Sequence, residues 1–480
     1  MPSLNALVFE AGIIARSLVE YVSGGALRLG VTGLSRAGKT VFITALINNL
    51  LSGARLPVLK ASAEGRIARA HLEPQPDDAV PRFGYEDHCA ALAGEDRHWP
   101  QSTRRISQLR IRIEFERAQG WGSKAAALTL DIVDYPGEWL LDLPLLSKTF
   151  AEWSRETLAA CASPARAPLA SEWLRHVNGL DPTAEASEDA ARKGAALFTA
   201  YLRQARETTY ALSTLPPGRF LMPGDLEGSP ALTFAPLPIE EGASPRPSTL
   251  AAMMERRYEA YKAHVARPFF RDHFARLDRQ IVLVDALAAL NSGPAAVRDL
   301  ENALAEILQA FRAGRASLLS TMFRPRIDRI LFAATKADHL HHRSHDRLEE
   351  ILRLLTARAI ARAEGVGASI DIIALAAIRA TREAQIRQGG ETLDAIIGVL
   401  ETGERLDGQV FDGKTEAAVF PGELPEDARA VFAGGAIGLG EQDSDWRFLR
   451  FRPPLVTPGA SPPHIRLDRA LQFLIGDRLA

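Results

Sequence analysis

Short apolar runs with the spacing of β-strands alternate along the chain with stretches that have the spacing of helices. The strand-like runs are 26–32, 109–116, 128–133, 281–284, 327–334 and 369–375. In 109–116 apolar and charged residues alternate, which is typical of a strand with one solvated face. Helical patterns occupy 41–51, 294–313 and 343–364. Strands that alternate with helices predict an α/β fold with a mainly parallel sheet covered by helices.

The strand pattern disappears between Trp139 and Gln280, where helix-like stretches at 150–161 and 189–212 take its place. We interpret this part of the chain as a large helical insertion. Within it, residues 214–250 contain eight prolines, which prevent a long helix and predict an extended loop.

The two ends of the chain have patterns of their own. Residues 1–24 predict an amphipathic helix, for which docking on the main body is favoured over a membrane anchor because its polar face lacks an excess of Lys and Arg. Asp-Gly pairs at 407–408 and 412–413 and an alternating run at 446–451 predict a β-hairpin, followed by a closing helix at 465–479. We therefore expect five parts: the N-terminal helix (1–24), the first part of the core (25–140), the helical insertion (141–280), the second part of the core (281–400) and a small β-containing C-terminal appendage (401–480).

Composition excludes several classes of protein. The 480 residues carry 57 Lys and Arg against 59 Asp and Glu, a formal charge of −2. This balance removes the basic field on which nucleic-acid binders rely, so we expect no nucleic-acid partner. Two cysteines, Cys89 and Cys161, provide no zinc knuckle or disulfide framework and fit a reducing compartment. The longest uncharged stretch, 40–54, is too short for a transmembrane segment.

A sequence between the first predicted strand and the helix 41–51 gives the clearest chemical signal. Residues 33–40 read GLSRAGKT, which fits the phosphate-loop pattern GxxxxGK[ST]. In such a loop the backbone amides at a helix N-terminus surround a polyphosphate. Lys39 would reach the β and γ phosphates, and the Thr40 hydroxyl would bind the Mg²⁺ that bridges them. We expect nucleotide contacts from Gly33, Ser35, Arg36, Ala37, Gly38, Lys39, Thr40 and Val41.

Asp134, Gly137 and Glu138 follow the strand-like run 128–133. A carboxylate at this end of a strand can hold Mg²⁺ through a water, and the amide of Gly137 can contact a γ-phosphate. Glu138 stands where small GTPases commonly have a glutamine that orients the attacking water. A carboxylate there accepts a hydrogen bond from water but repels the γ-phosphate, so we expect slow intrinsic hydrolysis. The alternative is an exposed glutamate at the start of a helix.

Thr335, Lys336 and Asp338 follow the strand-like run 327–334. The aspartate can accept hydrogen bonds from N1 and the exocyclic amine of guanine, while the lysine stem packs along the ring. Adenine cannot supply that pair of donors, so the motif predicts selectivity for guanine. In the loop after the last predicted strand, amides that face the guanine O6 are expected at Ala377 and Ile378, with an ordinary turn as the alternative.

The connection before 109–116 predicts a further metal ligand. In Ras-like proteins a threonine here binds Mg²⁺ and the γ-phosphate, so we choose Thr103, with Ser102 as the second choice. Arg36, Arg104 or Arg105 can supply an internal arginine finger, and solvated arginines are the alternative. The catalytic candidates are therefore Arg36, Lys39, Gly137 and Glu138.

Four histidines follow Asp338: His339, His341, His342 and His345. No cysteine lies nearby and the spacing fits no zinc finger. We interpret them as a polar loop that begins a helix rather than as a transition-metal site.

The motifs together resemble one family. GLSRAGKT, WPQST, DYPGEW, VDAL with Asn291 shortly after, TKADH, ALAAIRAT and RFRPP are similar to the YcjX-like family of bacterial stress-associated P-loop proteins. The resemblance implies a Ras-like GTPase core that binds GDP and GTP with Mg²⁺, in the cytoplasm and in a stress-related role. It also implies association with an inner-membrane protein. Carried over by motif, the phosphate residues are 33–40, the metal residues Thr40, Thr103 and Asp134, and the base residues Thr335, Lys336 and Asp338.

Three functions are consistent with the sequence. The first is a Mg²⁺-dependent GTP phosphohydrolase whose helical insertion reports the nucleotide state. The second is a nucleotide-loaded scaffold with negligible turnover, and the third is an ATPase or kinase.

Overall fold

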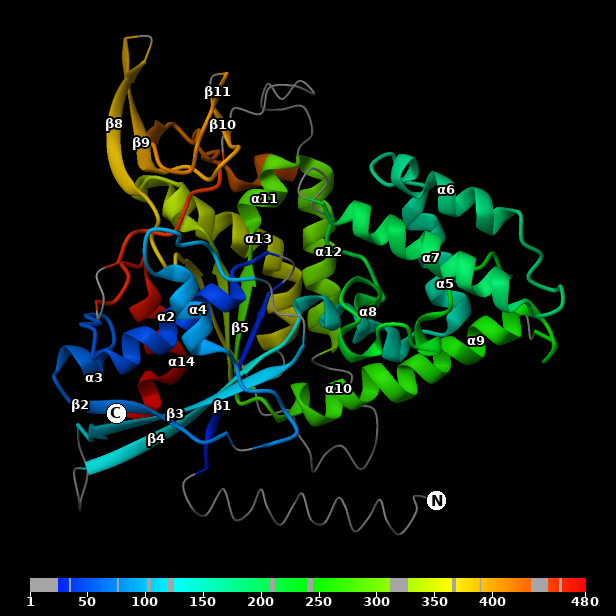
Figure 1. Ribbon diagram of the computed structural model, residues 1–480, viewed down its shortest axis with the longest axis horizontal. Coiled ribbons are helices and arrows are strands. Elements are labelled where there is room, and N and C mark those ends of the chain that lie inside the picture. The colour runs from blue at the N-terminus through cyan, green and yellow to red at the C-terminus, as the bar shows by residue number, and fades with distance from the viewer. Residues whose placement is uncertain are drawn as a thin grey trace.

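The computed structural model describes residues 25–33, 36–75, 77–101, 105–118, 125–207, 212–239, 245–310, 327–364, 368–388, 390–406, 408–432, 448–456 and 460–480. The helix expected at 1–24 and the candidates Ser35, Ser102, Thr103 and Arg104 lie outside these residues. Figure 1 shows a central sheet on one side and the helical insertion on the other.

The central sheet has seven strands in the order β2-β3-β4-β1-β5-β6-β7. Their bounds are β1 (Leu27–Gly33), β2 (Ile67–Glu73), β3 (Ser107–Glu116), β4 (Ala125–Asp134), β5 (Arg279–Val284), β6 (Arg329–Ala334) and β7 (Ser369–Ala374). β4, β1, β5, β6 and β7 run parallel, and β3 is antiparallel to both of its neighbours. The predicted α/β fold with a mainly parallel sheet is confirmed. The edge strand β2 was not predicted, because its exposed and half-buried residues do not alternate cleanly.

Helices cover both faces of this sheet. The alternation along β5 shows it: Ile281 and Leu283 pack in one core, while Val282 and Val284 pack in the other. The first core lies under α2 (Lys39–Leu51) and α14 (Leu467–Ile475), and the second lies under α11 (Ala286–Asn291), α12 (Pro294–Ala310) and α13 (His345–Glu364). Two short helices, α3 (Lys60–Ala63) and α4 (Tyr85–Leu92), precede β3.

The region between β4 and β5 is helical and has a core of its own. It contains α5 (Phe150–Cys161), α6 (Ala167–Asn178), α7 (Glu188–Ala205), α8 (Gly218–Leu221), α9 (Leu250–Tyr261) and α10 (Arg267–Asp272), with a π-helical turn at Lys262–Ala266 between the last two. A capping box starts α5: the Thr149 hydroxyl accepts from the Glu152 amide, and the Glu152 carboxylate accepts from the Thr149 amide.

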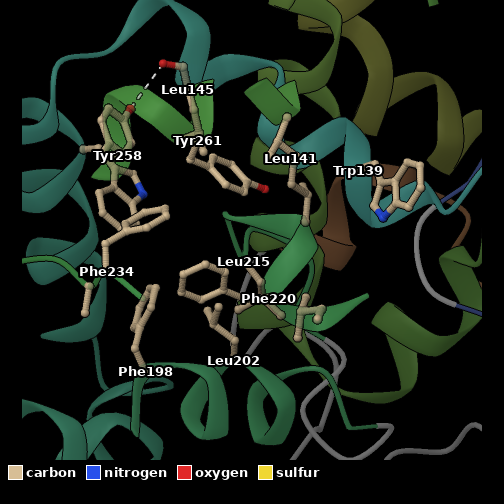
Figure 2. Close-up of a cluster of buried hydrophobic side chains, with 14 of the residues drawn as sticks. Trp139, Leu141, Leu145, Phe198, Leu202, Leu215, Phe220, Phe234, Tyr258 and Tyr261 are labelled. Atoms are coloured by element: carbon tan, nitrogen blue, oxygen red, sulfur yellow. Dashed lines mark hydrogen bonds between the residues drawn. The ribbon is translucent and has the colours of Figure 1, made fainter. Parts of the chain in front are cut away.

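Aromatic side chains dominate the core of the insertion. Trp153 stacks on Tyr258 at 5.1 Å between ring centroids, and Phe198 and Phe234 pack edge-on against Trp153. Figure 2 shows Phe198, Phe234 and Tyr258 within this cluster, together with Trp139 from the segment after β4. The core of the insertion therefore continues into the segment that follows β4.

The C-terminal region contains antiparallel strands. β8 (Arg382–Gln388), β9 (Glu391–Val399) and β12 (Glu416–Val419) form a three-stranded sheet, and β10 (Arg405–Leu406) pairs with β11 (Gln409–Val410). Gly408 and Gly413 have φ of 82° and 77°, as the Asp-Gly turn signals predicted. Within the described part of 446–451, pairing is limited to a bridge between Phe451 and Leu400. The closing helix is present as α14, but it packs on the central sheet.

Among the described residues, no helix combines the length and the apolar composition needed to cross a membrane.

Candidate functional site

The phosphate loop starts at the carboxyl end of β1, in the middle of the sheet. Gly33 is the last residue of this strand, and a Cβ atom there would lie 2.6 Å from the carbonyl oxygen of Leu283 in β5. A side chain at this position would force the two strands apart, so the chain requires glycine where the loop begins.

The loop then turns sharply into α2. Arg36 and Gly38 both have left-handed backbone conformations, with φ of 60° and 80°. Gly38 is the N-cap of α2 and has no side chain with which to cap the helix. The first amides of α2 therefore point out of the helix end without a side-chain cap from Gly38, in the arrangement that binds phosphate groups.

Lys39 and Thr40 are buried in the first turn of α2. The Lys39 Nζ donates a hydrogen bond to the carbonyl oxygen of Gly33 at 3.0 Å, so the side chain folds back over the loop. The Thr40 hydroxyl lies 3.4 Å from the carbonyl oxygen of Gln101. This contact brings the segment that precedes Thr103 to the phosphate loop.

Asp134 lies at the same edge of the sheet. It is the last residue of β4 and pairs in register with Val31 of β1, two positions before Gly33. The side chain is 1% exposed. The Thr40 hydroxyl and the Asp134 carboxylate are oxygen donors of the kind that Mg²⁺ prefers, and the fold brings both to the end of the β1–β4 pair.

The segment after Asp134 differs from the expectation. Gly137–Asp142 forms a buried 3₁₀ helix, and Glu138 is only 6% exposed. Its Oε1 lies 3.1 Å from Arg206, the C-cap residue that follows α7. Glu138 stands at the start of this short helix, as the alternative expected, but it is buried rather than exposed, because the insertion covers its carboxylate and supplies its counter-ion. Sequence reasoning missed Arg206, since nothing local marks a residue that pairs 68 positions away.

The short helix α8 packs directly on this 3₁₀ helix. A Cβ atom at Gly218 would lie 1.7 Å from the carbonyl oxygen of Glu138, so only glycine allows this approach. The Gly218 amide donates to Asp142 at 2.7 Å, and burial raises the pKa of that carboxyl to about 7. The Arg219 guanidinium lies 3.2 Å from the centre of the Trp139 ring.

The Thr335–Asp338 segment follows β6, which is separated from β1 by β5. Since these strands are parallel, the phosphate loop and this segment lie at the same edge of the sheet. Lys336 adopts a left-handed conformation, with φ of 59°, and its Nζ lies 2.5 Å from Asp285. Asp285 follows β5 and caps α11 by accepting from the Ala288 amide. The role of Asp285 as the partner of Lys336 was missed.

Asp338 is buried and held by the loop that follows β7. Its Oδ2 accepts from the Ala380 amide at 2.8 Å, and its backbone carbonyl accepts from the Thr381 hydroxyl. The Ala337 amide also bonds to the carbonyl oxygen of Leu375. The loop that contains Ala377 and Ile378 is therefore next to the predicted base-reading aspartate.

Phe451 contacts two segments that lie at the carboxyl edge of the sheet. The Trp99 indole donates to the Phe451 carbonyl oxygen at 2.6 Å, and the His339 ring packs edge-on against the Phe451 ring. The RFRPP segment thus contacts both the connection that precedes Thr103 and the residue after Asp338.

The fold and this arrangement define a class: a P-loop α/β protein with a Ras-like core, a helical insertion and C-terminal antiparallel β elements. The chain belongs to the YcjX-like family, DUF463, whose family model matches residues 27–479. It is 40% identical over 465 residues to the Ras-like GTPase YcjX of Escherichia coli K12, covering 94% of this chain and 96% of that protein. It is 37% identical over 500 residues to the Ras-like GTPase YcjX of Shewanella oneidensis MR-1, covering 97% of each. The family resemblance is confirmed.

Proposed function

We propose that this protein is a Mg²⁺-dependent GTP phosphohydrolase with slow intrinsic turnover, and that it acts as a nucleotide-controlled switch. One observation carries the proposal: the phosphate loop after β1 and the Thr335–Asp338 segment after β6 share the carboxyl edge of one parallel sheet. The name shared by the two relatives, Ras-like GTPase, supports it. The family resemblance adds a stress-related role in the cytoplasm and an effector at the inner membrane.

Different residues of the chain would bind the phosphates and the base. The amides of the phosphate loop and the Lys39 ammonium would bind the β and γ phosphates, while Thr40, Asp134 and Thr103 would hold Mg²⁺. The ion neutralises charge on the phosphates when it is bound with the nucleotide. Asp338 would accept the two donors of guanine, and the stem of Lys336, fixed at its end by Asp285, would cover the ring.

The helical insertion would report the nucleotide state through Gly137–Asp142. Contact between a γ-phosphate and the Gly137 amide would shift this 3₁₀ helix, and the shift would pass to α8 through Gly218 and to α7 through Arg206. Packed interfaces of this kind move between discrete arrangements rather than deform smoothly.

Three measurements test the proposal. Purified wild-type protein should release phosphate from GTP, ATP should fail to compete for binding, and Lys39→Ala should abolish turnover. Hydrogen exchange at residues 134–142 should differ between GDP and a non-hydrolysable GTP analogue. Identical exchange in both states would reject the switch, and equal competition by ATP would reject the guanine assignment.

A nucleotide-loaded scaffold is the second candidate, and the Glu138–Arg206 ion pair favours it. This pair holds the carboxylate that was expected to orient water. For a scaffold, GTP would bind with Mg²⁺, but phosphate release by the wild type would equal that of Lys39→Ala.

A further inference from the structure

Two adjacent histidines, His341 and His342, lie shortly after the Thr335–Asp338 segment and face the β8–β9 hairpin. Their ring centroids are 4.3 Å apart. The carboxylate of Glu383, the second residue of β8, approaches both rings. One ligand atom from each of the three side chains can be chosen so that all lie within 4.8 Å of one another.

The distances around Glu383 are close to those of a metal site. Its Oε2 lies 2.8 Å from the Nδ1 of His342 and 3.8 Å from the Nε2 of His341. Tetrahedral coordination with bonds of about 2.0–2.1 Å separates neighbouring ligand atoms by about 3.3 Å, so both of these distances lie within about 0.5 Å of the required value. The third pair, one nitrogen from each imidazole, lies within 4.8 Å, and the two rings would move toward each other on binding. The other oxygen, Oε1, faces Arg379 at 3.4 Å, which leaves Oε2 directed at the histidines.

A second carboxylate from the same face of the hairpin is placed to orient His341. Gln385 of β8 pairs with Asp394 of β9, and Glu383 precedes Gln385 by two residues, so Glu383 and Asp394 share a face. The Asp394 Oδ2 lies 3.8 Å from the Nδ1 of His341, the ring nitrogen opposite the one that faces Glu383. The same Nδ1 accepts from the Arg343 amide at 3.5 Å, so His341 would have to leave this contact and move about 0.6 Å toward Asp394 before Nδ1 could donate to the carboxylate, as metal-binding histidines characteristically do.

We propose that His341, His342 and Glu383 bind a divalent transition metal, for which Zn²⁺ is the best match, with Asp394 as the positioning residue for His341. Two imidazoles and one carboxylate are a ligand set that Zn²⁺ accepts, with a water in the fourth position. Mg²⁺ prefers oxygen ligands and does not fit two ring nitrogens. Arg343, whose side chain is 67% exposed, pairs with Asp394 at 2.9 Å and would give up this partner when Asp394 turns toward His341.

The bound metal would join two segments that already meet at Asp338. The histidines follow Asp338 in the chain, and Glu383 follows Ala380 and Thr381, which bond to Asp338. A metal at this place would hold the loop around the predicted base-reading aspartate in one conformation. The metal site itself does not depend on the proposed GTPase activity, because none of its ligands belongs to the phosphate loop.

The test is a calorimetric titration of the untagged full chain, stripped with chelator and free of nucleotide, with Zn²⁺ alone. We expect one equivalent to bind, and we expect His342→Ala and Glu383→Gln each to weaken binding at least tenfold. His264→Ala, which removes an exposed histidine of the insertion, is the matched control and should bind as the wild type does. Co²⁺ in place of Zn²⁺ should give the visible absorption of a four-coordinate ion, and His342→Ala should lose it.

Unfolding midpoints measured in the presence of chelator distinguish loss of metal binding from loss of folding. His342 is on the surface, so His342→Ala should unfold at the wild-type midpoint without metal, whereas added Zn²⁺ should raise the midpoint of the wild type alone. Absence of one-equivalent binding to the wild type would overturn the proposal. Equal Zn²⁺ affinity of wild type, His342→Ala and Glu383→Gln would also overturn it.

Discussion

The helical insertion and the C-terminal region both contact the candidate nucleotide site, but at different ends and with different groups. The insertion covers Gly137–Asp142, beyond β4, through a glycine contact, an aromatic–arginine contact and the buried Glu138–Arg206 pair. The region after β7 holds Asp338, beyond β6, through hydrogen bonds from Ala380 and Thr381.

This difference separates two properties of a nucleotide switch. A γ-phosphate is present in GTP and absent in GDP, so contacts beside Gly137 can distinguish the two nucleotides. The base is the same in both, so contacts around Asp338 set affinity without distinguishing them. Under the proposed function, the insertion would respond to the nucleotide state and the C-terminal region would retain the nucleotide.

Asp338→Asn should have the largest effect on nucleotide affinity, because it changes the residue that is proposed to bind the base. Loss of the carboxylate removes the acceptor for two guanine donors, so the affinities for GDP and GTP should fall alike, on the order of a thousandfold or about 4 kcal/mol. The new amide can pair with xanthine, which has a carbonyl in place of the amine, so affinity for XDP should rise. Titrations with fluorescent GDP and XDP measure both changes. Unchanged GDP affinity would remove Asp338 from the base site.

Asp142→Asn, in the segment that the insertion covers, should change how the free energy of unfolding depends on pH. Burial raises the pKa of Asp142 to about 7 from an ordinary value of 3.8, so between these values the folded protein holds a proton that the unfolded chain releases. Stability from this group therefore falls as pH rises through that window, by up to about 1.4 kcal/mol per pH unit. The asparagine removes the effect, so the stability gain of Asp142→Asn over wild type should grow by about 2 kcal/mol between pH 5 and 7. Urea unfolding at several pH values measures it, and a gain independent of pH would contradict the assignment.

Gly218→Ala should disrupt the packing of α8 on Gly137–Asp142. The added Cβ would meet the Glu138 carbonyl at 1.7 Å, so we expect a loss of about 2–3 kcal/mol in the free energy of unfolding. Gly194→Ala in α7 is the matched control, because its Cβ would lie 3.7 Å from Ala235, an ordinary contact, in a helix that favours alanine. Urea unfolding measures both losses. Equal losses in the free energy of unfolding for the two substitutions would show that α8 does not pack on Gly137–Asp142.

Arg206→Ala should have the smallest effect on stability, and it should remove the response of α7 to the bound nucleotide. Removal of the cation leaves Glu138 buried without this ion-pair partner, at a cost of about 1–2 kcal/mol. Glu138→Gln in the same chain should recover most of this loss, which a double-mutant cycle measures. Hydrogen exchange in α7 should then be the same with GDP and with a GTP analogue. Additive effects on stability would show that the two side chains do not interact.

The parts of the fold that could be predicted are those with a local signal. The buried parallel strands are continuous apolar runs, and GLSRAGKT carries its chemistry in eight adjacent residues. Because parallel strands end at one edge, the sequence also predicted that Asp134 and Asp338 would lie near the phosphate loop, and the sheet order places both strands near β1.

The parts that could not be predicted depend on contacts between distant residues. Glu138 meets Arg206 across 68 positions, and His342 meets Glu383 across 41. Each residue alone is an ordinary surface type, and only the packing of α7 or of the β8–β9 hairpin gives it a partner. For the same reason the sequence did not indicate the contacts of the histidines with Glu383 and Asp394, which come from a hairpin further along the chain.

The position of α14 has a consequence for biosynthesis. This helix completes the core that α2 shares with the central sheet, and Asp468 accepts from the Val58 amide across 410 positions. At about 5–20 residues per second, a ribosome needs roughly 20 to 80 seconds to make the intervening chain. During that time the core that α2 shares with α14 lacks this helix, so its apolar side chains stay incompletely covered until translation reaches α14.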